Sequence, residues 1–97
     1  MTYALLIKEE ATWDIAVAFD YYEEQQNGLG DAFLQKLKAL ILYINQYPLH
    51  FNKVEKEFRQ ALISKFPYVI IYELSGSEII IYAVFHCSQN PDKKFKG

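Results

Sequence analysis

The apolar residues of this chain follow two different periods, and that change limits the folds it can adopt. From about residue 9 to 47 they recur with a helical spacing, whereas from about residue 58 to 86 they form strand-like runs separated by short turns. Separate helical and strand-like blocks are typical of an α+β domain, with helices on one face of an antiparallel sheet. The length of 97 residues predicts one domain over residues 1–97.

Two helices joined by a glycine turn are predicted in the first half. The apolar stripe of the first helix comprises Ala11, Ile15, Ala18, Phe19 and Tyr22. The stripe of the second comprises Phe33, Leu37, Leu40, Ile41 and Ile44. The turn lies at residues 27–30, where Asn or Gly can adopt the left-handed conformation. We expect Asp31 to cap the second helix and Pro48 to end it, which makes an antiparallel helix hairpin.

Strands are predicted before and after this hairpin. Tyr3 to Ile7 is an apolar run too short for a stable helix, so it is expected to form an N-terminal strand. Pro48 to Glu57 reads as a polar connection from helices to sheet. A three-stranded antiparallel meander then follows, with strands at Phe58 to Ser64, Tyr68 to Leu74 and Glu78 to His86.

The pairing of the last two strands is predicted from the turn between them. A two-residue turn at Ser75-Gly76 would set Glu73 opposite Glu78. One face would then carry Tyr68, Ile70, Tyr72, Leu74, Ile79, Ile81, Ala83 and Phe85. The other, outer face would carry Val69, Ile71, Glu73, Glu78, Ile80, Tyr82, Val84 and His86. The first face is nearly all apolar and is therefore expected to form the core.

Composition excludes several classes of protein and site. Hydrophobic residues make up 52% of the chain, which is far from the composition of disordered proteins. The single Cys87 cannot form an intramolecular disulfide, and with His50 and His86 it supplies too few ligands for a zinc site, so no metal or cofactor is expected. No segment resembles an export signal or a membrane span, which favours the cytoplasm.

Charge is unevenly distributed along the chain. Residues 1–50 hold three Lys or Arg against seven Asp or Glu, while residues 51–97 hold seven against five. The net charge of −2 argues against tight nonspecific binding of nucleic acid. The basic residues of the second half could still form a local patch, although scattered solvated lysines are the simpler interpretation.

Trp13 and Val17 lie on the face of the first helix opposite its apolar stripe. Packing against the sheet cannot bury both faces of one helix, so these two residues are expected to be exposed. Single exposed apolar residues are common. An aromatic residue four positions before an aliphatic one nevertheless indicates a contact with a partner protein or a second copy.

Six further side chains are candidates for contact with a target or with nucleic acid: Arg59, Tyr82, His86, Gln89, Lys93 and Lys94. His86 could act as a general base or fix the end of the last strand, and Arg59 could bind phosphate or pair locally with Glu55 or Glu57. Tyr82 could stack on bases or belong to the core. Gln89 follows the last strand. Lys93 and Lys94 lie in residues 90–97, which are expected to form a flexible tail.

Short motifs distributed over nearly the whole chain resemble the RelE/ParE toxin superfamily. Their order and spacing carry the resemblance, since none is diagnostic alone. They are Tyr21-Tyr22-Glu23, Leu29-Gly30-Asp31-Ala32-Phe33-Leu34, Tyr47-Pro48, Arg59-Gln60-Ala61-Leu62, Phe66-Pro67-Tyr68 and Ala83-Val84-Phe85-His86. The resemblance implies a sheet with its inner face on the helix hairpin, a concave outer face toward a target, and a cognate antitoxin that wraps the toxin.

The resemblance also implies a toxic activity of one of two kinds. Members that cut mRNA on the ribosome use an arginine just past the last strand, where this chain has the neutral Gln89. A glutamine cannot neutralise the negative charge of a phosphoryl transition state. Inhibition of DNA gyrase, as in the ParE branch, is therefore favoured over ribosome-dependent mRNA cleavage. A third alternative is a toxin-derived binding module that is no longer toxic. A homodimer or a hetero-oligomer with the antitoxin is compatible with each.

Overall fold

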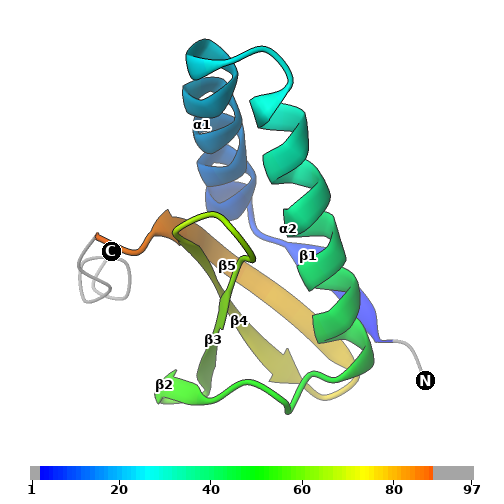
Figure 1. The fold of residues 1–97 in the computed structure, drawn as a ribbon. Coiled ribbons are helices and arrows are strands. Elements are labelled where there is room, and N and C mark those ends of the chain that lie inside the picture. Colours follow the sequence, from blue (N-terminus) through cyan, green and yellow to red (C-terminus); the bar gives the residue numbers. More distant parts are fainter. Residues whose placement is uncertain (1–2, 89–97) are drawn as a thin grey trace.

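The computed structural model describes residues 3–88 and places two helices on one face of a five-stranded sheet (Figure 1). The helix hairpin consists of α1 (Glu9–Gln25) and α2 (Leu29–Gln46), which lie side by side. The strands are β1 (Ala4–Ile7), β2 (Lys53–Glu55), β3 (Phe58–Leu62), β4 (Tyr68–Ser75) and β5 (Glu78–His86). The α+β class, the helix hairpin and the meander are as predicted, whereas Gln89, Lys93, Lys94 and the expected tail at 90–97 lie outside the described residues.

The sheet has the strand order β1-β5-β4-β3-β2. Strands β3, β4 and β5 form the predicted meander, and β1 pairs in parallel with β5 from Ala4↔Glu78 to Ile7↔Ile81. Parallel neighbours require a long crossover. Everything between β1 and β5, the helix hairpin included, serves as that crossover. The connection at 48–57 contains β2, a short strand that the polar sequence did not predict.

The core lies between the helix hairpin and the inner face of the sheet. Helix stripes and inner-face strand residues contribute the buried side chains of the main cluster: Ala11, Ala18, Tyr22, Phe33, Leu37, Ile44, Ala61, Ile63, Ile70, Tyr72, Ile79, Ile81 and Val84. The predicted helix stripes are therefore confirmed except at Phe19, which is half-buried and lies outside this cluster, whereas Ile15, Leu40 and Ile41 are partly buried against it.

The turn between the helices is held by a carboxylate from α1. Glu23 Oε2 accepts a hydrogen bond from the N–H of Gly28 at 3.0 Å, and its Oε1 accepts one from Gly30 at 2.9 Å. The prediction that Asp31 caps α2 is wrong, because α2 begins two residues earlier, at Leu29, after the left-handed Gly28. Two of the N–H groups at the start of α2, those of Gly28 and Gly30, are thus satisfied from the neighbouring helix, while Leu29 donates its N–H to the carbonyl of Gln26.

Gly30 permits this close approach of the two helices. A Cβ at this position would lie 2.7 Å from carbon atoms of the Phe19 ring and 2.9 Å from Glu23 Oε1. Real Cβ atoms essentially never come that close to another heavy atom. The glycine is therefore required by packing, whereas Gly28, with open space around it, is required by its positive φ of 86°.

A β-bulge in β5 changes the predicted faces of the sheet. Ile71 pairs with Ala83, but the next residue, Tyr72, pairs with Ile81, so Tyr82 is an extra residue in β5. One extra residue reverses the alternation of all positions beyond it. The predicted faces are correct for Ile79 and Ile81. They are wrong for residues 83–86, because Val84 and His86 lie on the helix side and Ala83 and Phe85 on the outer side.

The hairpin turn is also displaced from its predicted place. Ser75 pairs with Glu78, so the turn residues are Gly76 and Ser77, and Gly76 adopts a φ of 61°. A tight hairpin turn of this kind favours glycine at its first central position. Glu73 pairs with Ile80, so the predicted Glu73–Glu78 pair does not form.

Candidate functional site

The face of α1 that points away from the core carries an apolar stripe at helical spacing. Trp13 is 70% exposed, Val17 51% and Tyr21 54%. The exposure predicted for Trp13 and Val17 is confirmed. The sequence interpretation overlooked Tyr21, although its i+8 position relative to Trp13 places it on the same ridge. We call Trp13, Val17 and Tyr21 the outer stripe.

A groove of about 390 Å³ runs between the outer stripe and the end of β5. The outer stripe forms one wall, with Asp14 and Ala18, while Tyr68, Val84 and His86 form the other. Asp14 Oδ2 accepts a hydrogen bond from the N–H of Val84 at 3.0 Å. The last residue of β5 that pairs with β1 is Ile81, and Val84 lies beyond it. Where β1 ends, α1 therefore provides the hydrogen-bond acceptor for the edge of β5.

Carboxylates surround the outer stripe. On a helix with 100° per residue, Glu9, Glu10, Asp20 and Glu24 fall on the same side as Trp13 and Val17. All four are exposed, and we call them the acidic rim. Glu9 and Glu10 line a second hollow on the other side of Trp13. Between Lys8 and Lys36 the sequence contains neither Lys nor Arg, so α1 itself offers no positive charge to balance the rim.

His86 lies at the helix-facing end of β5, not on the outer face as predicted. Its ring is 5.2 Å from that of Tyr68, its partner on β4, in a T-shaped contact. Its Nδ1 is 3.0 Å from the backbone N of Ser88 and 2.8 Å from the Ser88 hydroxyl. These contacts agree with the interpretation that His86 fixes the end of the last strand.

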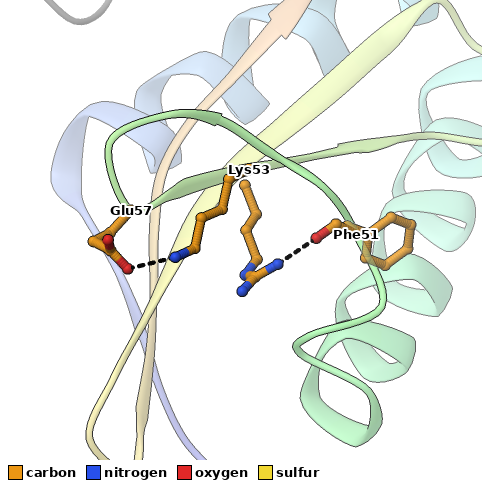
Figure 2. Close-up of polar contacts among 4 residues, drawn as sticks. Phe51, Lys53 and Glu57 are labelled. Atoms are coloured by element: carbon orange, nitrogen blue, oxygen red, sulfur yellow. Dashed lines mark hydrogen bonds and ion pairs between the residues drawn. The ribbon is translucent and has the colours of Figure 1, made fainter.

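The Arg59 side chain is hydrogen-bonded to the backbone of the segment that connects α2 to the sheet. Its Nη1 donates a hydrogen bond to the carbonyl of Phe51 at 2.6 Å. Figure 2 shows this contact beside an ion pair between Lys53 and Glu57, with 3.0 Å between Nζ and Oε1. The ion pair of Glu57 is thus made by Lys53, whereas the hydrogen bond of Arg59 joins β3 to the segment after α2.

Tyr82 lies on the outer face, where it packs its ring on Phe58 with 4.9 Å between centroids. Its hydroxyl donates a hydrogen bond to Glu73 Oε1 at 3.0 Å. Burial, together with this hydrogen bond and the negative charge of Glu73, raises the pKa of the Tyr82 hydroxyl. The ring is half-buried, and the neighbouring outer-face cluster consists of Val69, Ile71, Ala83 and Phe85.

The two candidate catalytic residues do not form one site. Arg59 pairs with Tyr72 and His86 with Tyr68, on opposite sides of β4. Tyr68 and Tyr72 are four residues apart on β4, which corresponds to about 13 Å along the strand. Strands β3 and β5 are two strand spacings apart, which adds a separation of about 9.5 Å across the sheet. A general base and a phosphate-binding arginine must both reach the reacting group, so these positions are too far apart to serve one phosphodiester.

Within residues 3–88 no group of three or more potential ligands could hold a metal ion. The helices described there are not long and apolar enough to cross a membrane.

Solved structures that share this fold include the following two. The first, from the chromosomal ParDE toxin–antitoxin system of P. aeruginosa, superposes with a TM-score of 0.78 at 15% identity, covering 88% of this chain and 96% of that one. The second, the E. coli toxin RelE as a free double arginine-to-alanine mutant, has a TM-score of 0.72 at 15% identity, covering 99% and 93%.

Comparison of the sequence itself gives the family. A search of curated proteins found no match. The family model for the ParE toxin of the type II toxin–antitoxin system parDE, however, matches residues 5–91, which include both helices, strands β2 to β5 and all of β1 except Ala4. The chain therefore belongs to the ParE toxin family of type II toxin–antitoxin systems.

Proposed function

We propose that this toxin is held inactive by a cognate antitoxin and that, when released, it inhibits DNA gyrase by binding rather than by catalysis. The separation of Arg59 from His86 is the observation that carries the choice of binding over catalysis. The match to the ParE model supports the same choice.

The local contacts of both residues favour structural roles. The Arg59 guanidinium already donates to a backbone carbonyl, and the His86 ring contacts Tyr68 and Ser88. Just after the last strand, at the position where the ribonucleases of this superfamily carry an arginine, this chain has the neutral Gln89. A protein that acts by binding needs a complementary surface and no general base, and it acts where gyrase is found, in the cytoplasm.

Inducible expression in bacteria tests the proposal directly. We expect growth arrest, filamentous cells and a DNA-damage response before any fall in mRNA, and purified toxin should inhibit supercoiling by gyrase. The His86→Ala variant should remain as toxic as the unmodified chain. Rapid cleavage of mRNA at preferred codons, abolished by His86→Ala, would instead establish the ribonuclease.

Co-expression tests the antitoxin. The product of the adjacent short gene should restore growth and co-purify with the toxin. Light scattering measures the molar mass of the purified complex, which gives the number of toxin and antitoxin chains and shows whether two toxins are present. Healthy growth at high expression without that gene would support the third alternative, a binding module without toxicity.

A further inference from the structure

The outer face of the sheet holds apolar side chains that are buried although no described helix lies over them. Both α1 and α2 pack on the opposite face (Figure 1). Phe85 is nevertheless only 3% exposed, and Ile71 is 0% exposed. Within residues 3–88, the partly buried hydrophobic side chain that packs against this outer-face cluster is Phe58. A sheet face that is open to water leaves its side chains partly exposed, so a further layer covers β4 and β5.

The neighbouring strand shows where this cover lies. Leu62 on β3 pairs with Val69 on β4, and antiparallel partners project from the same face of a sheet. Leu62 is 61% exposed, whereas Val69 is 4% exposed. The cover therefore lies over β4 and β5 and leaves the rim at Leu62 open. It is on the side of the sheet where the chain leaves β5, after His86.

The chain beyond Ser88 is long enough to provide the cover. Residues 89–97 are nine residues, which span about 30 Å at most when extended. Ala83, the member of the outer-face cluster farthest back along β5, precedes Ser88 by five residues, or about 16 Å. Asn90 is followed by Pro91, a dipeptide that favours a turn. A chain that reverses there can reach the whole cluster.

The composition of this segment matches the face. Its one large apolar side chain is Phe95, and a ring of this size contributes most when it is buried against other apolar groups. Glu73 supplies a negative charge on the outer face, where its carboxylate accepts the hydrogen bond of Tyr82. Complementary charges favour such a contact. The basic residues around Phe95 are Lys93, Lys94 and Lys96.

We propose that residues 89–97 fold back over the outer face of the sheet, seat the Phe95 ring on the outer-face cluster, and close this face to other partners. The polar composition of the segment predicts a flexible tail, and Phe95 is the side chain that anchors it. Displacement of the segment exposes an apolar surface on β4 and β5. The contact lies within one chain, so this inference does not depend on gyrase or on an antitoxin.

Tryptophan fluorescence of the full-length chain tests the position of the ring. Trp13 is the single tryptophan and is exposed, so Trp13→Phe gives a background without its emission. In this background Phe95→Trp should emit at a blue-shifted wavelength and resist quenching by acrylamide. The matched control, Gly97→Trp, should emit to the red and be quenched readily. Equal emission and quenching at the two positions would overturn the proposal.

A double-mutant cycle tests which surface the ring contacts. Phe95→Ala and Phe58→Ala should each lower the Tm of thermal unfolding. The double variant should lose less than the sum of the two shifts, because both substitutions remove one contact. The control pair combines Phe95→Ala with Leu42→Ala, at an exposed residue of α2, and should be additive. Phe58→Leu serves if Phe58→Ala does not fold. Additive shifts at positions 58 and 95 would show that the ring packs elsewhere.

Binding of the dye 1-anilinonaphthalene-8-sulfonate, which fluoresces on exposed apolar surface, tests the closure of the face. Phe95→Ser should bind several-fold more dye than the unmodified chain, and the control Lys93→Ser should not. Equal dye binding by all three would refute closure. A dimer of the unmodified chain that persists in Phe95→Ser, measured by light scattering, would show that a second copy covers the face instead. Absence of growth arrest would remove the proposed function without changing these readouts.

Discussion

The carboxylate of Asp14 on α1 accepts a hydrogen bond from the backbone N–H of Val84 on β5, 70 positions later in the chain, at 3.0 Å. Strand β1 covers the edge of β5 only as far as Ile81, where Lys8 donates its N–H to the Ile81 carbonyl before α1 begins. The helix therefore replaces the strand as the hydrogen-bonding partner of the edge. This contact joins the wall of the groove to the sheet.

Removal of the Asp14 carboxylate should destabilise the fold. Asp14→Ala leaves the partly buried Val84 N–H without this acceptor, which costs about 1–3 kcal/mol in the free energy of unfolding. Asp14→Asn retains an acceptor oxygen and should cost less. Urea unfolding measures both, with Asp20→Ala, at an exposed position of the same helix, as a control expected to stay within about 0.5 kcal/mol. Equal effects at positions 14 and 20 would contradict the stabilising role of the bond.

The two glycines of the helix turn should respond differently to a methyl group. Gly30→Ala should cost about 1–3 kcal/mol because its Cβ collides with the Phe19 ring. Gly28→Ala should cost about 1–2 kcal/mol because of its left-handed backbone. In a Phe19→Leu background the cost of Gly30→Ala should fall while that of Gly28→Ala should not change. A double-mutant cycle by thermal unfolding measures this, and additive effects at 19 and 30 would refute the collision.

Tyr72 should make stability depend on alkaline pH. Its hydroxyl is buried and donates a hydrogen bond to the Pro48 carbonyl at 2.7 Å, and burial raises its pKa to about 12. The folded state therefore favours the neutral phenol. Its contribution is complete below the unfolded pKa of about 10 and is lost between about pH 10 and 12, by up to about 2–3 kcal/mol.

Urea unfolding at pH 8 and at pH 11.5 measures this dependence. The stability difference between the unmodified chain and Tyr72→Phe should shrink at the higher pH. Tyr47→Phe removes the hydroxyl of an exposed tyrosine and should leave the pH profile unchanged. A gap between the unmodified chain and Tyr72→Phe that is the same at both pH values would contradict the buried, neutral state of this hydroxyl.

Arg59 should prove to be a structural residue. Arg59→Ala removes the hydrogen bond to Phe51 and should lower stability by about 1–3 kcal/mol. Arg59→Lys retains the charge with a less suitable donor and should cost less. Growth arrest on expression should persist in Arg59→Lys. A folded Arg59→Lys variant without toxicity would show instead that the guanidinium contacts the target.

Local patterns in the sequence were sufficient for every described element except β2, and for most of the faces of these elements. The helical stripes through Phe33 and Tyr22 predicted which sides of α1 and α2 are buried, and the same periodicity predicted the exposure of Trp13. A period arises from the repeating geometry of one element, so a single segment of sequence contains it. The strand runs and the ends of the helices at Gly28 and Pro48 depend on similarly local chemistry.

The tertiary structure decided the details that depend on contacts between distant segments. The bulge at Tyr82 lies next to the last pair that β5 forms with β1, and the alternation of the strand contains no sign of it. It moved His86 from the predicted outer face to the groove beside α1. The cap supplied by Glu23 and the parallel pairing of β1 likewise require segments to meet in space. A hydrogen bond between residues that are far apart leaves no period in the sequence, because its geometry exists only after the chain has folded.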